Sequence, residues 1–155
     1  MDLGASQKRY RRPRKFYKKL ADELTLYAEH VGWLCASVKP PNAKDSKTFQ
    51  RLKLMPDGDP ALELPEADAG ICALWAECGR CMNTGMGISP LSWQEIESYA
   101  ASNIVNDFEK QMIRKMSEHY CSSLNSNDEY YAIPPGWTKQ QALERNRIVN
   151  MLNQK

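Results

Sequence analysis

Apolar side chains near the start of this sequence recur every three or four positions, which is the spacing of one face of an α-helix. Pro13 precedes them and suits the first turn of a helix, where a missing backbone N–H costs little. The apolar positions are Phe16, Leu20, Leu24, Tyr27, Val31 and Leu34. The pattern predicts a long amphipathic helix over residues 13–35.

Three later helices are predicted from capping signatures, in which a small polar side chain and a Glu or Gln three positions on satisfy free backbone N–H groups. The signatures are Ser92 with Glu95, Asn106 with Glu109, and Thr138 with Gln141. One more helix is expected to begin after Pro65 and to end at the glycine-rich stretch 85–87. The sequence therefore predicts an all-α fold, a small bundle of four to five short helices.

Prolines and polar turn residues divide the chain between these helices. Residues 36–65 hold five of the nine prolines and are predicted to form a long irregular connector, either a linker or a loop-rich segment. Within it, residues 49–54 alternate apolar and polar side chains, but a single strand without a partner is not stable. The other predicted parts are a basic arm over 1–12, a compact helical core over 66–121, and a loop with a C-terminal helix over 122–155.

The net charge of +2 hides a basic beginning and an acidic remainder, because residues 1–20 sum to +7 and residues 21–155 sum to −5. The basic side chains are Lys8, Arg9, Arg11, Arg12, Arg14, Lys15, Lys18 and Lys19. Such a run neutralises nucleic-acid phosphates, contacts an acidic protein surface, or contacts the chain's own acidic stretch, 57–77. We interpret it as a partner-binding arm, with a protein as the favoured partner and nucleic acid as the alternative.

Composition argues against membrane insertion and secretion. The longest apolar run, residues 71–76, has six residues, whereas a membrane helix needs about 20. The N-terminus lacks the apolar segment of a secretory signal. The five cysteines are therefore expected to be reduced thiols, and the sequence indicates a cytoplasmic protein without a membrane partner.

Cys78 and Cys81 have C-x-x-C spacing, and with Cys72 they are the candidate metal ligands. Such a pair can hold two corners of a tetrahedral zinc site. The residues that would complete the site are Cys35, His119 and Cys121. Because the spacing matches no second zinc knuckle and the pair lies in a helical pattern, we favour ordinary buried thiols and expect no cofactor.

Neither histidine forms a catalytic constellation in the sequence. His119 and Cys121 are two positions apart and so point to different sides of a helix, while His30 and Cys35 are five apart near a helix end. The glycines at 85 and 87 lack the lysine and the preceding strand of a phosphate-binding loop. We therefore predict that the protein is not an enzyme.

Large apolar side chains of the core region have two candidate roles, because flexible thioethers and aromatic rings suit both a packed core and an adaptable binding surface. The candidates for a core face or a partner-binding face are Trp75, Met82, Trp93, Met112 and Met116. Both tryptophans fall on apolar helix positions, so we expect them in the core.

Residues 71–121 carry a series of spaced motifs. They are Leu74-Trp75, Cys78-x-x-Cys81, Gly85-x-Gly87-Ile88-x-Pro90, Ser92-Trp93-x-x-Ile96-x-x-Tyr99, Phe108-Glu109, Ile113-x-x-Met116 and Tyr120. Over this third of the chain the sequence resembles tail assembly chaperones and minor tail proteins of long-tailed bacteriophages. The resemblance implies a non-enzymatic role in the cytoplasm of the infected cell, where such a chaperone keeps the helical tape-measure protein soluble and helps recruit tail-tube subunits.

Two other functions stay open from the residues alone. A nucleic-acid-binding regulator would use the basic arm, and its binding to random DNA would fall with salt. A phage-encoded inhibitor of a host defence complex would bind a protein partner without catalysis.

Overall fold

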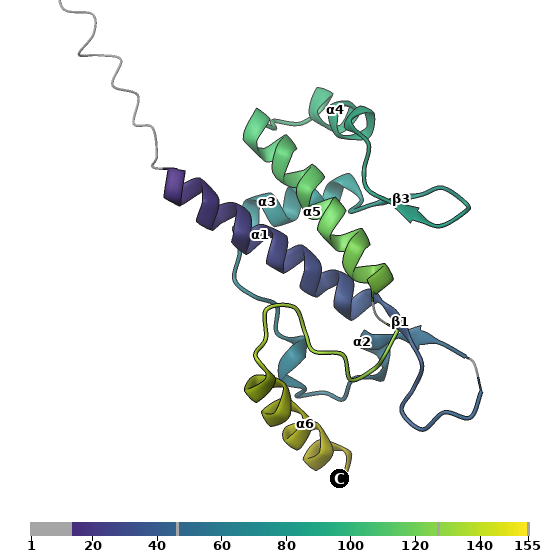
Figure 1. The fold of residues 1–155 in the computed structure, drawn as a ribbon. Helices are drawn as coiled ribbons and strands as arrows, with labels where there is room; N and C mark the ends of the chain where they lie inside the picture. The colour runs from purple at the N-terminus through teal and green to yellow at the C-terminus, as the bar shows by residue number, and fades with distance from the viewer. Residues whose placement is uncertain (1–13, 46, 127, 155) are drawn as a thin grey trace, which may run out of the picture.

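The computed structural model describes residues 14–45, 47–126 and 128–154, and helices dominate it (Figure 1). The helices are α1 (Arg14–Cys35), α2 (Arg51–Leu54), α3 (Ala69–Cys78), α4 (Trp93–Ala101), α5 (Asp107–Ser126) and α6 (Lys139–Asn153), with a 3₁₀ turn, η1, at Pro60–Leu62. Two antiparallel pairs of short strands join β1 (Ser37–Val38) to β2 (Phe49–Gln50) and β3 (Met82–Asn83) to β4 (Ile88–Ser89). The predicted all-α fold class is confirmed. No helix among the described residues is long and apolar enough to span a membrane.

The two longest helices, α1 and α5, lie side by side and run in the same direction (Figure 1). Near their C-terminal ends His119 Nδ1 lies 2.6 Å from Glu29 Oε1. Gly32 allows the close approach, since a Cβ there would lie 2.6 Å from the backbone oxygen of Tyr120. The predicted amphipathic helix therefore exists, and α5 is its main partner.

A first hydrophobic core joins α1 and α5 to α3 and α4. The fully buried Trp75 of α3 is central to it, with Tyr27 and Tyr120 packed edge-on against its ring at centroid distances of 6.4 and 5.4 Å. Edge-to-face pairs of this kind stabilise a core beyond the burial of their area. The buried members are Leu24, Ala28, Val31, Ile71, Trp75, Leu91, Ile96, Met112, Ile113, Met116, Tyr120 and Cys121.

The segment predicted as a connector, residues 36–65, is packed against the end of α1 and does not act as a spacer. Its β2 has the partner that the sequence pattern did not reveal, because Phe49 pairs with Val38 of β1. A second core lies beneath it, formed by Trp33, Leu34, Val38, Met55, Ala61 and Tyr130. The chain from 128 to 137 and helix α6 complete this lower part of the molecule (Figure 1).

Helix α3 ends earlier than the sequence indicated. Gly79 adopts the left-handed conformation, with φ of 103°, and its N–H bonds back to Ala76. The stretch 85–87, which was predicted to end the helix, lies between β3 and β4, in the hairpin that projects from the helices in Figure 1. Met82, a candidate for the core or partner-binding face that falls within the predicted helix, belongs to β3.

The predicted caps are present in the structure, with both hydrogen bonds of the capping box at α5 and α6 and the Ser92 half of it at α4. Ser92 Oγ accepts a hydrogen bond from Glu95 N at 3.2 Å at the start of α4. At the start of α6 both halves of a capping box form, with Thr138 N donating to Gln141 Oε1 at 2.8 Å and Gln141 N donating to Thr138 Oγ1 at 3.2 Å. These contacts confirm the predicted starts of α4 and α6. The remaining signature, Asn106 with Glu109, lines the candidate site described below.

Buried charges that the sequence did not reveal hold the lower core together. Arg145 of α6 donates from Nε and Nη2 to the two carboxylate oxygens of Asp59, each at 2.9 Å. The Trp33 ring lies near two guanidinium groups, with the Arg51 and Arg145 carbons 4.3 and 5.2 Å from its centroid. Arg51 also donates to the backbone oxygens of Trp33 and Glu129, and burial lowers its pKa to about 10.

His30 makes the lower core sensitive to acid. Its side chain is 1% exposed, and its Nε2 donates to Ala61 O at 2.7 Å. Burial lowers the pKa of His30 below its ordinary value of 6.5. Below that value the unfolded chain binds a proton that the folded chain resists, so stability falls as the pH falls.

We therefore expect the free energy of unfolding to decrease between pH 7.5 and pH 5.5 by up to about 1.4 kcal/mol per pH unit from this group. Urea denaturation at the two pH values measures it. His30→Gln should flatten the pH dependence, whereas His119→Gln, which removes the half-exposed histidine, should leave most of it. Equal slopes in the wild-type protein and His30→Gln would contradict the assignment.

Candidate protein-binding groove

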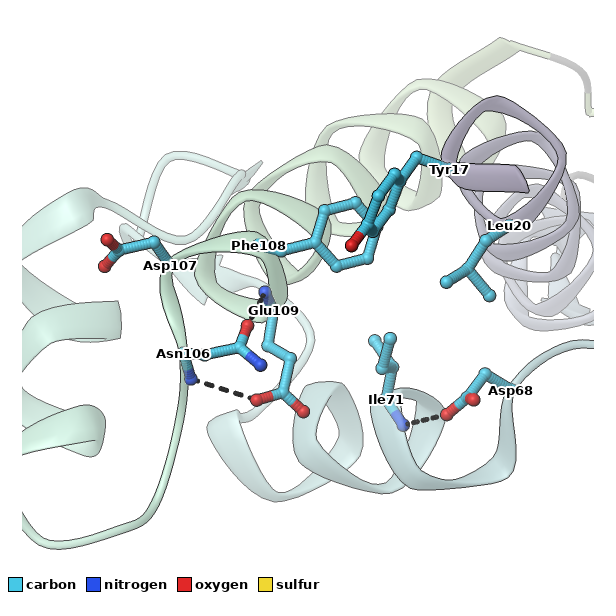
Figure 2. Close-up of a pocket in the computed structure, with 8 residues that line it drawn as sticks. All are labelled: Tyr17, Leu20, Asp68, Ile71, Asn106, Asp107, Phe108 and Glu109. Atoms are coloured by element: carbon cyan, nitrogen blue, oxygen red, sulfur yellow. Dashed lines mark hydrogen bonds between the residues drawn. The ribbon is translucent and has the colours of Figure 1, made fainter. Parts of the chain in front are cut away.

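The N-terminal ends of α1, α3 and α5 meet around an open groove of about 650 Å³ (Figure 2). The three helix starts are far apart in sequence, and the packing of α1 against α5 and of α3 against α5 brings them together. The lining residues divide into an apolar wall and a polar rim. The groove is therefore a product of tertiary packing and not of a local motif.

Two aromatic rings form much of the apolar wall. Tyr17 of α1 and Phe108 of α5 lie with their centroids 5.0 Å apart and their planes tilted by 59°. Tyr17 is 41% exposed, so its ring presents apolar surface to the outside. Leu20 and Ile71 continue the wall below the two rings, and Figure 2 shows both side chains directed toward the groove. This surface suits an apolar side chain or the aliphatic stem of a lysine or arginine.

The rim carries the carboxylates of Asp68 and Glu109 at the starts of α3 and α5, whereas that of Asp107 points away from the groove (Figure 2). Asp68 Oδ1 accepts from Ile71 N at 2.9 Å and so caps α3. Asn106 Oδ1 accepts from Glu109 N at 2.8 Å, and Glu109 Oε1 accepts from Asn106 N at 2.9 Å, which is the predicted capping signature. The Asp107 side chain is 97% exposed. Negative charge at a helix N-terminus is favourable, so the same residues stabilise the helices and make the rim acidic.

The eight lining residues include three carboxylic acids and one tyrosine, and none of the eight is a histidine, cysteine, serine or threonine. The carboxylates of Asp68 and Glu109 are engaged in helix caps. The groove therefore offers a ligand an apolar, partly aromatic wall beside negatively charged carboxylates.

The structure places half of the predicted basic arm. Lys8, Arg9, Arg11 and Arg12 lie outside the described residues. The other four cations occupy the first two turns of α1 and are exposed: Arg14, Lys15, Lys18 and Lys19. Since Tyr17 belongs to the same turns, positive charge on α1 lies beside the acidic rim of the groove.

The predicted apolar face is divided between core and surface. Trp75, Met112 and Met116 are buried in the first core, and Met82 is half-buried in β3. Trp93 is 49% exposed at the start of α4, so its prediction as a core residue is wrong. Trp93 lies on the predicted apolar stripe, but the packing leaves about half of its side chain exposed to solvent.

Cys81 has Cys35 and Cys121 as neighbours, which is not the grouping with Cys78 and Cys72 that the C-x-x-C spacing suggested. Cys78 lies at the end of α3 while Cys81 follows the turn at Gly79, where its thiol hydrogen-bonds that of Cys121. In the described part of the chain, no three side chains of His, Cys, Asp or Glu are placed to hold a metal ion. Burial raises the pKa of Cys72 and of Cys121 to about 11, as expected for protonated, packed thiols.

The groove was not identified from the sequence, although its parts were. Glu109 was assigned to a helix cap, and Phe108 was named among the spaced motifs of residues 71–121. The acidic residues at the starts of two helices are visible in the sequence and could have indicated an acidic surface. Only the packing of the two helices against each other makes them parts of one surface. In comparisons with known proteins, no family model, no curated protein and no solved structure gives a significant match to this chain.

Proposed function

We propose that this chain is a non-enzymatic protein-binding factor whose groove receives a basic, amphipathic helix of a partner protein. The observation that carries the proposal is the aromatic pair of the exposed Tyr17 and the half-buried Phe108, beside the carboxylates of Asp68 and Glu109 at the starts of α3 and α5. A helix that binds in a groove inserts apolar side chains at helical spacing. Lysine or arginine side chains on the same helix can lay their stems on the rings and direct their charges to the rim.

The resemblance to phage tail assembly chaperones supports a helical partner. It spans residues 71–121, and within that span lie Ile71 of the apolar wall and Asp107, Phe108 and Glu109 beside it. Under this proposal the tape-measure protein, which is long and helical in such phages, is the first partner to test. The resemblance implies a helical partner, and the acidic rim adds the requirement that the bound segment carry basic residues.

A binding experiment tests the proposal with variants that keep the fold. Glu109→Gln preserves the capping box, and Asp68→Asn preserves the cap, because glutamine and asparagine cap as well as the acids do. The probe is a fluorescent amphipathic peptide of about 20 residues, leucine-rich on one face and lysine-rich on the other. We expect each neutral variant to weaken binding about three- to fivefold at low salt, and Phe108→Ala to weaken it about tenfold.

The matched control is Glu118→Gln, which removes a carboxylate from the middle of α5, where Glu118 pairs with Arg114. It should leave peptide affinity unchanged. Circular dichroism of each variant checks that helix content is kept. If the peptide binds equally well to the control, to Glu109→Gln and to Phe108→Ala, the groove is not its site. A pull-down with a tape-measure protein then tests the phage role directly.

Nucleic-acid binding is a second candidate, favoured by one observation. Arg14, Lys15, Lys18 and Lys19 are all exposed on the first turns of α1, and exposed cations on one element can neutralise successive phosphates. Binding to random duplex DNA that weakens steeply with salt, and that is lost when these four residues become glutamine, would favour this function over the groove.

A further inference from the structure

Three cysteine thiols come together where the end of α1, the turn after α3 and the second half of α5 meet. Cys35 is the last residue of α1, Cys121 lies on α5, and Cys81 follows the left-handed turn at Gly79. The thiol of Cys121 donates a hydrogen bond to the sulfur of Cys81, and Cys35 is a further neighbour of Cys81. None of the three lines the groove, so this cluster has no part in the proposed function.

The turn after α3 holds Cys81 against α5. Arg80, the preceding residue, has a φ of 63°, in the left-handed region that residues other than glycine rarely adopt. Its backbone oxygen accepts hydrogen bonds from Ser117 Oγ at 2.6 Å and from Trp75 Nε1 at 3.3 Å. Ser117 is fully buried on α5, and Cys121 lies one turn further along the same face of that helix. The fold therefore places the two thiols side by side.

The two thiols differ in reactivity. Cys121 is buried, and burial raises its pKa to about 11. Burial also raises the pKa of Cys81, but the Arg80 guanidinium and the S–H of Cys121 oppose that rise. Because the thiolate is the nucleophile and Cys81 is only half-buried, Cys81 is the sulfur that a small oxidant reaches first. Cys121 then supplies the second thiol.

We propose that Cys81 and Cys121 form a site of reversible oxidation, at which a hydroperoxide converts the two thiols into a disulfide. With hydrogen peroxide, the sulfur of Cys81 attacks one oxygen, an S–O bond forms as the O–O bond breaks, and the departing oxygen leaves as water with the thiol proton. The sulfur of Cys121 then attacks that of Cys81. The S–S bond forms as the S–O bond breaks, and a second water carries away the Cys121 proton. The two thiols lose two electrons, which the peroxide gains.

The disulfide joins the turn after α3 to α5 and closes a loop that contains the β3–β4 hairpin and α4. Cys81 and Cys121 are 40 positions apart, since 121 − 81 = 40. A cross-link over such a loop stabilises the fold mainly by restricting the unfolded chain. A dithiol reductant such as dithiothreitol restores the two thiols by thiol–disulfide exchange.

Peroxide treatment of the full chain, followed by peptide mapping without reduction, tests the proposal. Trypsin cuts after lysine and arginine, so it places Cys81 in the peptide 81–110 and Cys121 in the peptide 116–139, with the other cysteines elsewhere. We expect these two peptides to be joined at least about tenfold more than any other pair, because groups held together by the fold react far faster than groups that meet by diffusion. Dithiothreitol should separate them again.

Single substitutions distinguish the roles of the two thiols. In Cys121→Ser the reaction stops after its first step, so the sulfenic acid of Cys81 accumulates and reacts with dimedone. In Cys81→Ser no disulfide forms, and Cys121 stays unlabelled because its thiol is buried and protonated. Cys78→Ser is the matched control, since it removes the C-x-x-C partner of Cys81 and should leave the yield of the disulfide unchanged. Circular dichroism of each variant checks that the fold is kept.

Several products would overturn the proposal. A main link from Cys81 to Cys78 or to Cys35, or a disulfide between two copies of the chain, would assign the partner of Cys81 wrongly. Dimedone labelling of Cys121 in Cys81→Ser that equals the labelling of Cys81 in Cys121→Ser would contradict the order of the steps. A Cys81 that remains a thiol after N-acetylcysteine in the same solution is fully oxidised would exclude the reaction itself.

The unfolded chain gives a control for proximity in the sequence. In concentrated urea the pairing depends on the entropy of loop closure, which favours short loops, so links among Cys72, Cys78 and Cys81 should replace the link to Cys121. The same main link in the folded and unfolded chain would contradict the proposal. The oxidised protein should also unfold at a higher urea concentration than the reduced protein, with no such shift in Cys121→Ser. A lower midpoint for the oxidised protein would show that the bond distorts the fold, and the proposal would fail.

Discussion

Replacing Arg145 by methionine is expected to lower the free energy of unfolding by about 3–5 kcal/mol, because it leaves the carboxylate of Asp59 buried without its partner. Arg145 and Asp59 are 2% and 3% exposed, and two hydrogen bonds of 2.9 Å join them. The substitution also removes one of the two guanidinium groups beside Trp33. Urea denaturation followed by circular dichroism measures the loss.

The matched control lies on the same helix. Arg147 pairs with Glu144 at the surface, with side chains 61% and 53% exposed, and exposed pairs contribute about 0–1 kcal/mol. Arg147→Met should therefore change stability little. Adding Asp59→Leu to Arg145→Met should recover part of the loss, since it removes the unpaired charge. Equal losses for Arg145→Met and Arg147→Met would show that the buried pair is not what holds α6 in place.

The buried pair matters to α6 because the helix has little other anchorage. Arg145 and Val149 are its buried residues, while Leu143 and Met151 are exposed. We expect backbone amides of α6 to exchange faster with solvent in Arg145→Met than those of α1. Local release of α6 thus accompanies the global loss of stability.

Trp75→Ala is expected to lower the free energy of unfolding by about 3–5 kcal/mol, the usual loss for removing a large buried aromatic side chain. The Trp75 ring is fully buried between Tyr27 and Tyr120, so the substitution leaves a cavity where α1, α3 and α5 meet. Urea denaturation measures this loss as well, and a lower amplitude of the tryptophan fluorescence change accompanies it.

Trp93→Ala is the control for the same chemical change. With half of its side chain already exposed, Trp93 should contribute about 1 kcal/mol or less. The two tryptophans both lie on apolar stripes of predicted helices, so the sequence ranks them equally. A similar loss for both substitutions would contradict the burial seen in the structure.

Helix starts were the most predictable features. The caps at Ser92, Asn106 and Thr138 depend on hydrogen bonds between residues three positions apart, and such contacts are visible in the sequence itself. The end of α3 was missed because two glycine-containing turns compete for it. Gly79 closes the helix first, and its left-handed conformation can be seen only in the folded backbone.

Contacts between distant residues could not be predicted in this way. The pairing of β1 with β2 and the bond of Arg145 with Asp59, 86 residues apart in sequence, give the connector a core of its own. Neither the strand pairing nor the Arg145–Asp59 pair can be recognised from residues that are close together in the sequence. The groove depends similarly on residues near 17, 68 and 108, which only the packing of three helices brings together.

The sequence by itself determined the helical fold class, the starts of α4, α5 and α6, and the division of charge between a basic beginning and an acidic remainder. These depend on side-chain periodicity, on hydrogen bonds within one turn, and on composition. Only the tertiary structure decided that Trp75 is buried while Trp93 is exposed, that the connector is packed, and that the acidic caps of α3 and α5 border one groove with α1. Burial and proximity depend on which elements pack together, because a side chain leaves water only where another part of the chain covers it.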